Sequence, residues 1–152
     1  MGTTVEFYSA DPEEFTALFS STDEERFFDK LKNFPVADFS FHLHLPHDLD
    51  RLCQSLLKQH LPVPSIFRNL FVKQLWYDGI SESLVLISDT FATIVASLDD
   101  TQIEKIAQDW SADFDDKRPV KETDAYQGLI QLRKVAQDAV DRKKSLILHL
   151  VG

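Results

Sequence analysis

The chain has 152 residues, of which 43% are hydrophobic and 27% are charged, and its formal net charge is −9. A chain of this length can bury roughly two-thirds of its unfolded surface in one core, so we expect a single domain spanning residues 1–152. The acidic balance argues against nucleic acid and anionic membranes as partners, because both are bound through clustered Lys and Arg side chains. Such a surface serves solubility, or it attracts a basic protein.

The cysteine content and the N-terminus indicate a compartment. Cys53 is alone, so the chain cannot form an internal disulfide. The first residues lack the basic start and apolar run of a signal peptide, and no apolar stretch reaches the roughly 18 residues of a membrane-spanning helix. We therefore expect a cytoplasmic protein without a membrane segment.

The first third of the chain alternates strand and helix patterns. Residues 5–8 have the composition of a strand, and Asp11 followed by Pro12 is typical of a helix start, which predicts a helix to about residue 20. Thr22 opens a second helix that Pro35 ends. Apolar residues then alternate with Ser and His over residues 39–45, which predicts a half-buried strand. A helix follows from Asp48 to about residue 61.

The rest of the chain predicts a hairpin, three helices and a last strand. Asp78 and Gly79 lie between strand patterns at residues 73–77 and 83–87. Helices are predicted over residues 89–97, 99–110 and 123–144, with a long polar loop at 113–123 before the last of them. Residues 146–151 are almost all apolar, which indicates a strand in the middle of a sheet. Together these patterns predict an α+β fold, with helices packed on a mostly antiparallel sheet of about five strands.

Three histidines form the one cluster with a recognisable chemistry. His42 and His44 leave the same face of the predicted strand about 6.6 Å apart, and His47 follows the bend at Pro46. Neutral imidazoles are good ligands for zinc or a similar divalent metal, which would activate a water molecule for hydrolysis. The spacing overlaps the metallo-β-lactamase motif, but Pro46 stands where that motif has an aspartate. The alternative is that these histidines occupy a solvated or helix-covered face.

Other reactive residues have simpler explanations. Cys53 lies on the apolar stripe of its helix, and His60 is two turns away, about 10.5 Å, which is too far for proton transfer. Asp113, Asp115 and Asp116 lack the glycine and distal glutamate of a calcium loop, so we interpret them as a solvated acidic segment. Exposed aromatic residues often anchor partners. Trp76 and Tyr77 are candidates for that role, whereas the helical stripe places Trp110 in the core.

Segments at both ends of the chain resemble a known family. The family-like features are Met1-Gly2, Phe7-Tyr8, residues 11–15 (Asp-Pro-Glu-Glu-Phe), the paired helical patterns between Leu86 and Trp110, and residues 145–152 (Ser-Leu-Ile-Leu-His-Leu-Val-Gly). On these stretches the chain resembles the uncharacterised bacterial YfbM-like family. The resemblance implies a compact α+β domain and assigns no activity to any residue.

Three functions remain open from the sequence. The absence of a complete catalytic motif and the acidic charge favour a non-enzymatic protein-binding module, such as an inhibitor or immunity-type partner of a basic protein. The second is a metal-dependent hydrolase that uses His42, His44 and His47. The third is a small-molecule binder with a pocket between sheet and helices.

Overall fold

The computed structural model describes residues 4–21, 24–39, 47–58, 70–112 and 116–152. Within these residues the chain forms a five-stranded antiparallel sheet with helices packed on it, so the predicted α+β class is confirmed. The strands are β1 (Thr4–Ala10), β2 (Val36–Asp38), β3 (Phe71–Tyr77), β4 (Glu82–Ile87) and β5 (Ser145–Val151). Their order across the sheet is β2-β1-β5-β4-β3. The last strand therefore lies in the middle, as predicted.

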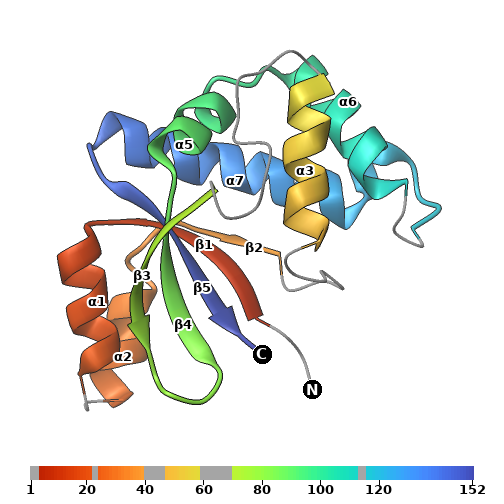
Figure 1. Cartoon of the computed structure of the whole chain (residues 1–152). Helices are drawn as coiled ribbons and strands as arrows, with labels where there is room; N and C mark the ends of the chain where they lie inside the picture. Colours follow the sequence, from red (N-terminus) through yellow and green to blue (C-terminus); the bar gives the residue numbers. More distant parts are fainter. Residues whose placement is uncertain (1–3, 22–23, 40–46, 59–69, 113–115) are drawn as a thin grey trace.

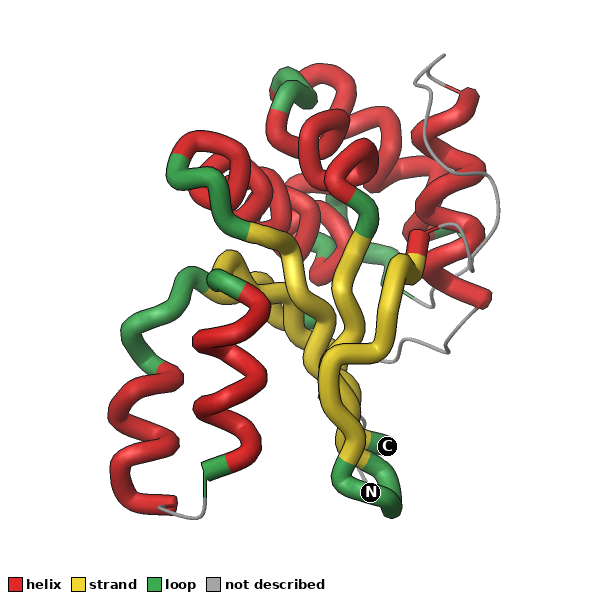
Figure 2. Tube along the Cα trace, turned by 60° about the vertical axis from the view of Figure 1, so that its left-hand side comes forward, coloured by secondary structure: helices red, strands yellow, loops and turns green. Residues whose placement is uncertain are grey.

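Helices cover both faces of the sheet (Figures 1 and 2). Helices α1 (Pro12–Ser20) and α2 (Glu24–Leu31) lie on one face. On the other face α5 (Asp89–Ala96) and α7 (Asp124–Asp141) contact the strands, and α6 (Asp100–Ser111) and α3 (His47–Lys58) pack beyond α7. A short 3-10 helix, η1 (Val120–Glu122), precedes α7.

The two faces of β5 belong to two separate hydrophobic clusters. Leu146 and Leu148 join the larger cluster under α5 and α7, whereas Ile147 joins the smaller cluster under α1 and α2. Successive side chains of a strand point to opposite faces, so a strand that is buried on both sides is apolar at almost every position. This double burial explains the composition that marked residues 146–151 as a central strand.

Local capping signals fix several helix starts where the sequence predicted them. The Asp11 carboxylate accepts a hydrogen bond from the Glu14 amide at 3.0 Å, and Pro12 is the first helical residue. Asp99 and Gln102 form a reciprocal capping box at the start of α6. Each contact satisfies amide groups that the first turn of a helix leaves without partners.

Several predicted segments differ from the structure. Strand β2 (Val36–Asp38), which pairs with β1 through Val36 and Tyr8, ends before the predicted strand of residues 39–45 begins. Phe39 is not in a strand, and residues 40–45 lie outside the described residues. Helix α7 ends at Asp141, because Lys143 adopts a left-handed conformation (φ 55°) and the Lys144 amide bonds the Ala139 carbonyl. The segment predicted as a long loop contains η1.

Gly128 of α7 allows close contact with the ring of Phe39. A Cβ atom at Gly128 would lie 2.8 Å from Cε1 of Phe39. The ring is fully buried, with ring centroids 5.6 Å from Phe7 and 5.8 Å from Trp110, so it has little room to shift. Glycine here serves packing between α7 and the segment after β2.

We predict that Gly128→Val lowers the free energy of unfolding by about 1–3 kcal/mol, the usual cost of overpacking a core. Chemical denaturation measures the change. Lys134→Val, at an exposed position of the same helix, is the matched control and should cost about 0.5 kcal/mol or less. If Gly128→Val were as stable as the wild type, the Phe39 ring would have room to move away from a side chain at position 128.

Candidate functional site

The predicted metal cluster falls mostly on residues that the structure does not describe. His42 and His44 lie outside the described residues, and His47 is the first residue of α3, where only its backbone is described. Within the described ranges, no group of three or more His, Cys, Asp or Glu residues has the arrangement of a metal site. The metal hypothesis therefore stays a prediction.

Cys53 and Trp110 lie in the core, as predicted. Burial, helped by the nearby Asp50 carboxylate, raises the pKa of the Cys53 thiol to about 12. A thiol with this pKa stays protonated near neutral pH and is a poor nucleophile. The Trp110 indole donates a hydrogen bond to the Asp48 carbonyl at 2.9 Å and so ties α6 to the start of α3.

The most unusual polar group is a histidine in the central strand. The ring of His149 is sandwiched between two carboxylates: Nδ1 lies 3.0 Å from Glu6 of β1, and Nε2 lies 3.0 Å from Glu82 of β4. His149 is only 7% exposed. One imidazole therefore connects three neighbouring strands on the face that carries α1 and α2.

The two carboxylates favour the charged form of the His149 ring. Burial by itself lowers the pKa of His149, because a charged ring loses its water. The hydrogen bonds to Glu6 and Glu82, with their negative charges, outweigh burial and raise the pKa above its ordinary value of 6.5. A ring with both nitrogens bonded to carboxylates is satisfied as an imidazolium, since both nitrogens are then donors.

Aromatic rings close the cluster on the side of the helices. The Phe19 ring of α1 packs against His149 in a T-shaped arrangement with centroids 4.9 Å apart, and Tyr8 lies 6.4 Å away. Burial and the carboxylates of Glu6 and Asp38 raise the pKa of Tyr8, so its hydroxyl stays neutral. The cluster is thus a buried structural charge rather than an open acid–base site.

The turn between β3 and β4 presents a rigid apolar tip. The Asp78 carboxylate accepts hydrogen bonds from the amides of Ile80, Ser81 and Glu82 at 2.8–3.0 Å. The Tyr77 hydroxyl donates to the Ile80 carbonyl at 3.1 Å. Ile80 is nevertheless 84% exposed and Tyr77 is 50% exposed. The fold therefore holds a large aliphatic side chain in water on a fixed backbone.

The sequence identified part of this tip. Tyr77 was a predicted partner anchor, and its exposure fits that role, whereas Trp76 is half-buried and packs against Phe19. Ile80 carried no signal, because an isolated isoleucine between Gly79 and Ser81 resembles any loop residue. The turn between β3 and β4 lies at the end of the sheet where β1 starts and β5 ends (Figures 1 and 2).

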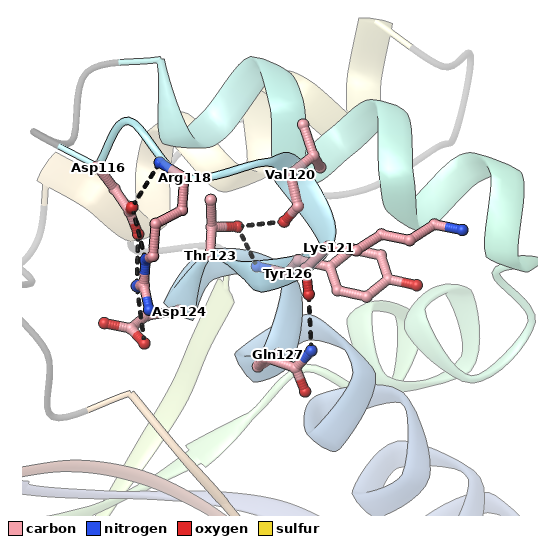
Figure 3. A network of polar contacts seen from close by, with 8 residues as sticks. All are labelled: Asp116, Arg118, Val120, Lys121, Thr123, Asp124, Tyr126 and Gln127. Atoms are coloured by element: carbon pink, nitrogen blue, oxygen red, sulfur yellow. Dashed lines mark hydrogen bonds and ion pairs between the residues drawn. The ribbon is translucent and has the colours of Figure 1, made fainter.

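A polar network joins η1 to the start of α7 (Figure 3). Asp116 accepts two hydrogen bonds from the Arg118 guanidinium at 2.7 and 2.8 Å, and Arg118 also pairs with Asp124 at 3.3 Å. The pairing lowers the pKa of Asp116 to about 2. These groups bond one another, and Thr123 caps α7 through the Tyr126 amide, so we interpret the network as structural. Asp113 and Asp115 lie outside the described residues.

Two further serines bond carboxylates across elements. Ser9 of β1 donates to Asp138 of α7 at 2.7 Å, and Ser55 of α3 donates to Asp109 of α6 at 2.5 Å. Both serines are buried. Each serine donates a hydrogen bond to a carboxylate on another element, so each pair holds two elements together.

The hollows around α1 are open rather than enclosed between sheet and helices. A groove of about 660 Å³ runs between α1 and the strands β3 and β4. A smaller hollow of about 150 Å³ lies between the end of β1 and the segment after α7. The groove is large enough for a peptide side chain or two. Its lining combines the apolar residues Ala17, Leu75 and Leu86 with the charged residues Asp11, Glu13 and Lys73.

Comparisons with known proteins leave the function open. No family model, curated protein or solved structure matches the chain. The resemblance to the YfbM-like family accordingly stays a prediction. Among the helices that the structure describes, none is long and apolar enough to cross a membrane.

We predict that the contribution of His149 to stability disappears at alkaline pH. Because its pKa is raised in the folded protein, the contribution is complete below the unfolded pKa of about 6.5 and is lost as pH rises through the folded pKa. His149→Gln should therefore lower the free energy of unfolding by about 2–3 kcal/mol near pH 6, and by much less near pH 9. Denaturation of both proteins across this range measures the difference.

Glu82→Gln provides the control for this mechanism. It keeps a hydrogen-bonding partner at Nε2 but removes one negative charge, so the loss of stability should begin at a lower pH than in the wild type. A difference between wild type and His149→Gln that does not change with pH would mean that the ring is neutral in the folded protein.

The metal hypothesis has a direct test. If His42, His44 and His47 bind zinc, the purified protein contains stoichiometric metal by elemental analysis, and His44→Ala loses it. His60→Ala, which changes a histidine outside the cluster, should retain the metal. A protein that binds no metal at saturating zinc, manganese or iron eliminates the hydrolase alternative.

Proposed function

We propose that this protein is a non-enzymatic, cytoplasmic protein-binding module that holds a basic partner through the tip Tyr77–Ile80 of the β3–β4 hairpin. An inhibitor or immunity-type role fits this mode of action, because a rigid exposed turn can enter a cleft of its target. The observation that carries the proposal is the exposure of Ile80 on a turn whose backbone is fixed by Asp78.

Preorganisation is the physical reason why this tip suits binding. Ordering a loop on association costs free energy, and a turn that is already ordered avoids that cost. Three hydrogen bonds to one carboxylate and a fourth from the Tyr77 hydroxyl hold the turn before any partner arrives. A large apolar side chain on such a support has the character of an interface hot spot.

The charge around the tip supports a basic partner. The hydrogen bonds from the turn lower the pKa of Asp78, so it is ionised at neutral pH. Glu82 lies at the end of the turn, and with a protonated His149 ring the trio Glu6, Glu82 and His149 carries one net negative charge. With a net charge of −9, the chain attracts a positively charged surface over long range and repels nucleic acid.

The chemistry of the described core supports binding over catalysis. The buried thiol of Cys53 has a high pKa, and the hydroxyls of Ser9 and Ser55 are engaged with Asp138 and Asp109. His149 is occupied on both nitrogens. These groups stabilise the fold in their present contacts and would have to break them to react.

We predict that Ile80→Asp strongly weakens partner binding while the fold is retained. Wild-type protein and the variant would be used as immobilised bait in extracts, and the captured protein would then be purified and titrated by calorimetry. Loss of a hot-spot side chain should weaken the affinity by about 30-fold or more. Association should also slow steeply as salt is added, since the partner is basic.

Val140→Asp is the matched control, because it changes an exposed valine on α7 in the same way. It should bind the partner as the wild type does. A partner that binds Ile80→Asp with unchanged affinity, or a captured protein that is acidic, would refute the proposal.

A further inference from the structure

The groove beside α1 continues the proposed binding surface along β3. It is lined on the sheet side by Lys73, Leu75 and Leu86, and on the α1 side by Asp11, Pro12, Glu13, Thr16, Ala17 and Ser20. Tyr77, which supports the tip, follows Leu75 by two residues on the same strand. A partner seated on the tip therefore reaches this groove without crossing another element.

We propose that the groove receives an extended, basic segment of the partner, which pairs with the outer edge of β3 as an added strand. The inference rests on the proposed function and specifies the form of the partner at the interface. It predicts a segment in which apolar and cationic side chains alternate, because successive residues of a strand point to opposite sides.

The position of β3 supports strand addition. It is an outer strand, and β4 is the strand that pairs with it among the described residues. Val72, Lys73 and Gln74 are all exposed, so neither face of this part of the strand is fully covered. An outer strand leaves backbone amides and carbonyls that a second chain can bond.

Features of β3 disfavour its pairing with the same strand of a second copy. Its register with β4 shifts between Phe71 and Lys73 and again between Gln74 and Trp76. Such irregularities, and an exposed lysine at an edge, hinder the flat pairing of two identical sheets. A second copy would also bring together two chains of charge −9. These features favour a short foreign segment over self-association.

The side chains of the groove define what that segment carries. Leu75, Leu86 and Ala17 offer an apolar surface for an aliphatic residue. Glu13 and Asp11 are at the first turn of α1, where they can accept hydrogen bonds from a Lys or Arg side chain; Asp11 uses one oxygen to cap the helix. An apolar side chain inward and a cation toward α1, away from Lys73 on the sheet side, match both sets of groups.

The test uses a displayed library of random peptides selected on the full-length protein. Enriched peptides should alternate aliphatic and basic residues, and a synthetic copy should protect amides of β3 from hydrogen exchange. Ala17→Arg, which places a long cation in the groove from an exposed helix position, should weaken peptide binding at least tenfold. Gln108→Arg makes the same change of charge on an exposed position of α6 and should leave binding unchanged.

Four results would overturn the inference. The first two are a selection that enriches no peptides, and peptides that bind Ala17→Arg as tightly as the wild type. The other two are peptide binding that does not protect the amides of β3, and a wild-type dimer in sedimentation that Ala17→Arg dissociates. If Ile80→Asp weakens peptide binding and Ala17→Arg does not, the peptides bind the tip and not the groove. The failure of this inference is therefore distinguishable from failure of the proposed function.

Discussion

The antiparallel pairing of β1 with β5 is the contact on which the other elements depend. The two strands pair along their whole length, from Thr4 opposite Val151 to Ala10 opposite Ser145. Strand β2 then adds to β1, and β4 adds to β5. Both hydrophobic clusters are built on this pair, since Phe7 and Leu148 face α7 while Tyr8 and Ile147 face α1. Without it, neither layer of helices has a surface to cover.

His149 makes the register of that pairing costly to change. A slip of one residue would turn the side chains of β5 to the opposite face. The imidazolium would then enter the cluster of Leu146 and Leu148, away from Glu6 and Glu82. An unpaired buried charge costs several kcal/mol, roughly as much as the whole domain can spare. The His149 cluster therefore selects one register of β1, β5 and β4, whose apolar residues alone are compatible with several registers.

Sequence patterns predicted the features that depend on neighbouring residues. Asp11 with Pro12, Asp99 with Gln102, and Asp78 with Gly79 are local signals, and each marks the helix start or turn it predicted. The His149 cluster could not be predicted from local patterns, because its two carboxylates are 143 and 67 residues away in the sequence. Strand β2 was not predicted, because its three residues include one small apolar side chain, Ala37, and give a weak strand signal beside Phe39. Exposure of Ile80 depends on tertiary geometry and has no local pattern.

The place of β5 has a consequence for how the protein is made. It is the last strand in the sequence and the middle strand of the sheet. During synthesis, β1 and β4 leave the ribosome without the strand that joins them, so their apolar faces stay uncovered until residues 145–151 emerge. Contacts between such distant segments form slowly, and the waiting chain is exposed to aggregation. The nascent chain therefore exposes these apolar faces until β5 has emerged and paired with β1 and β4.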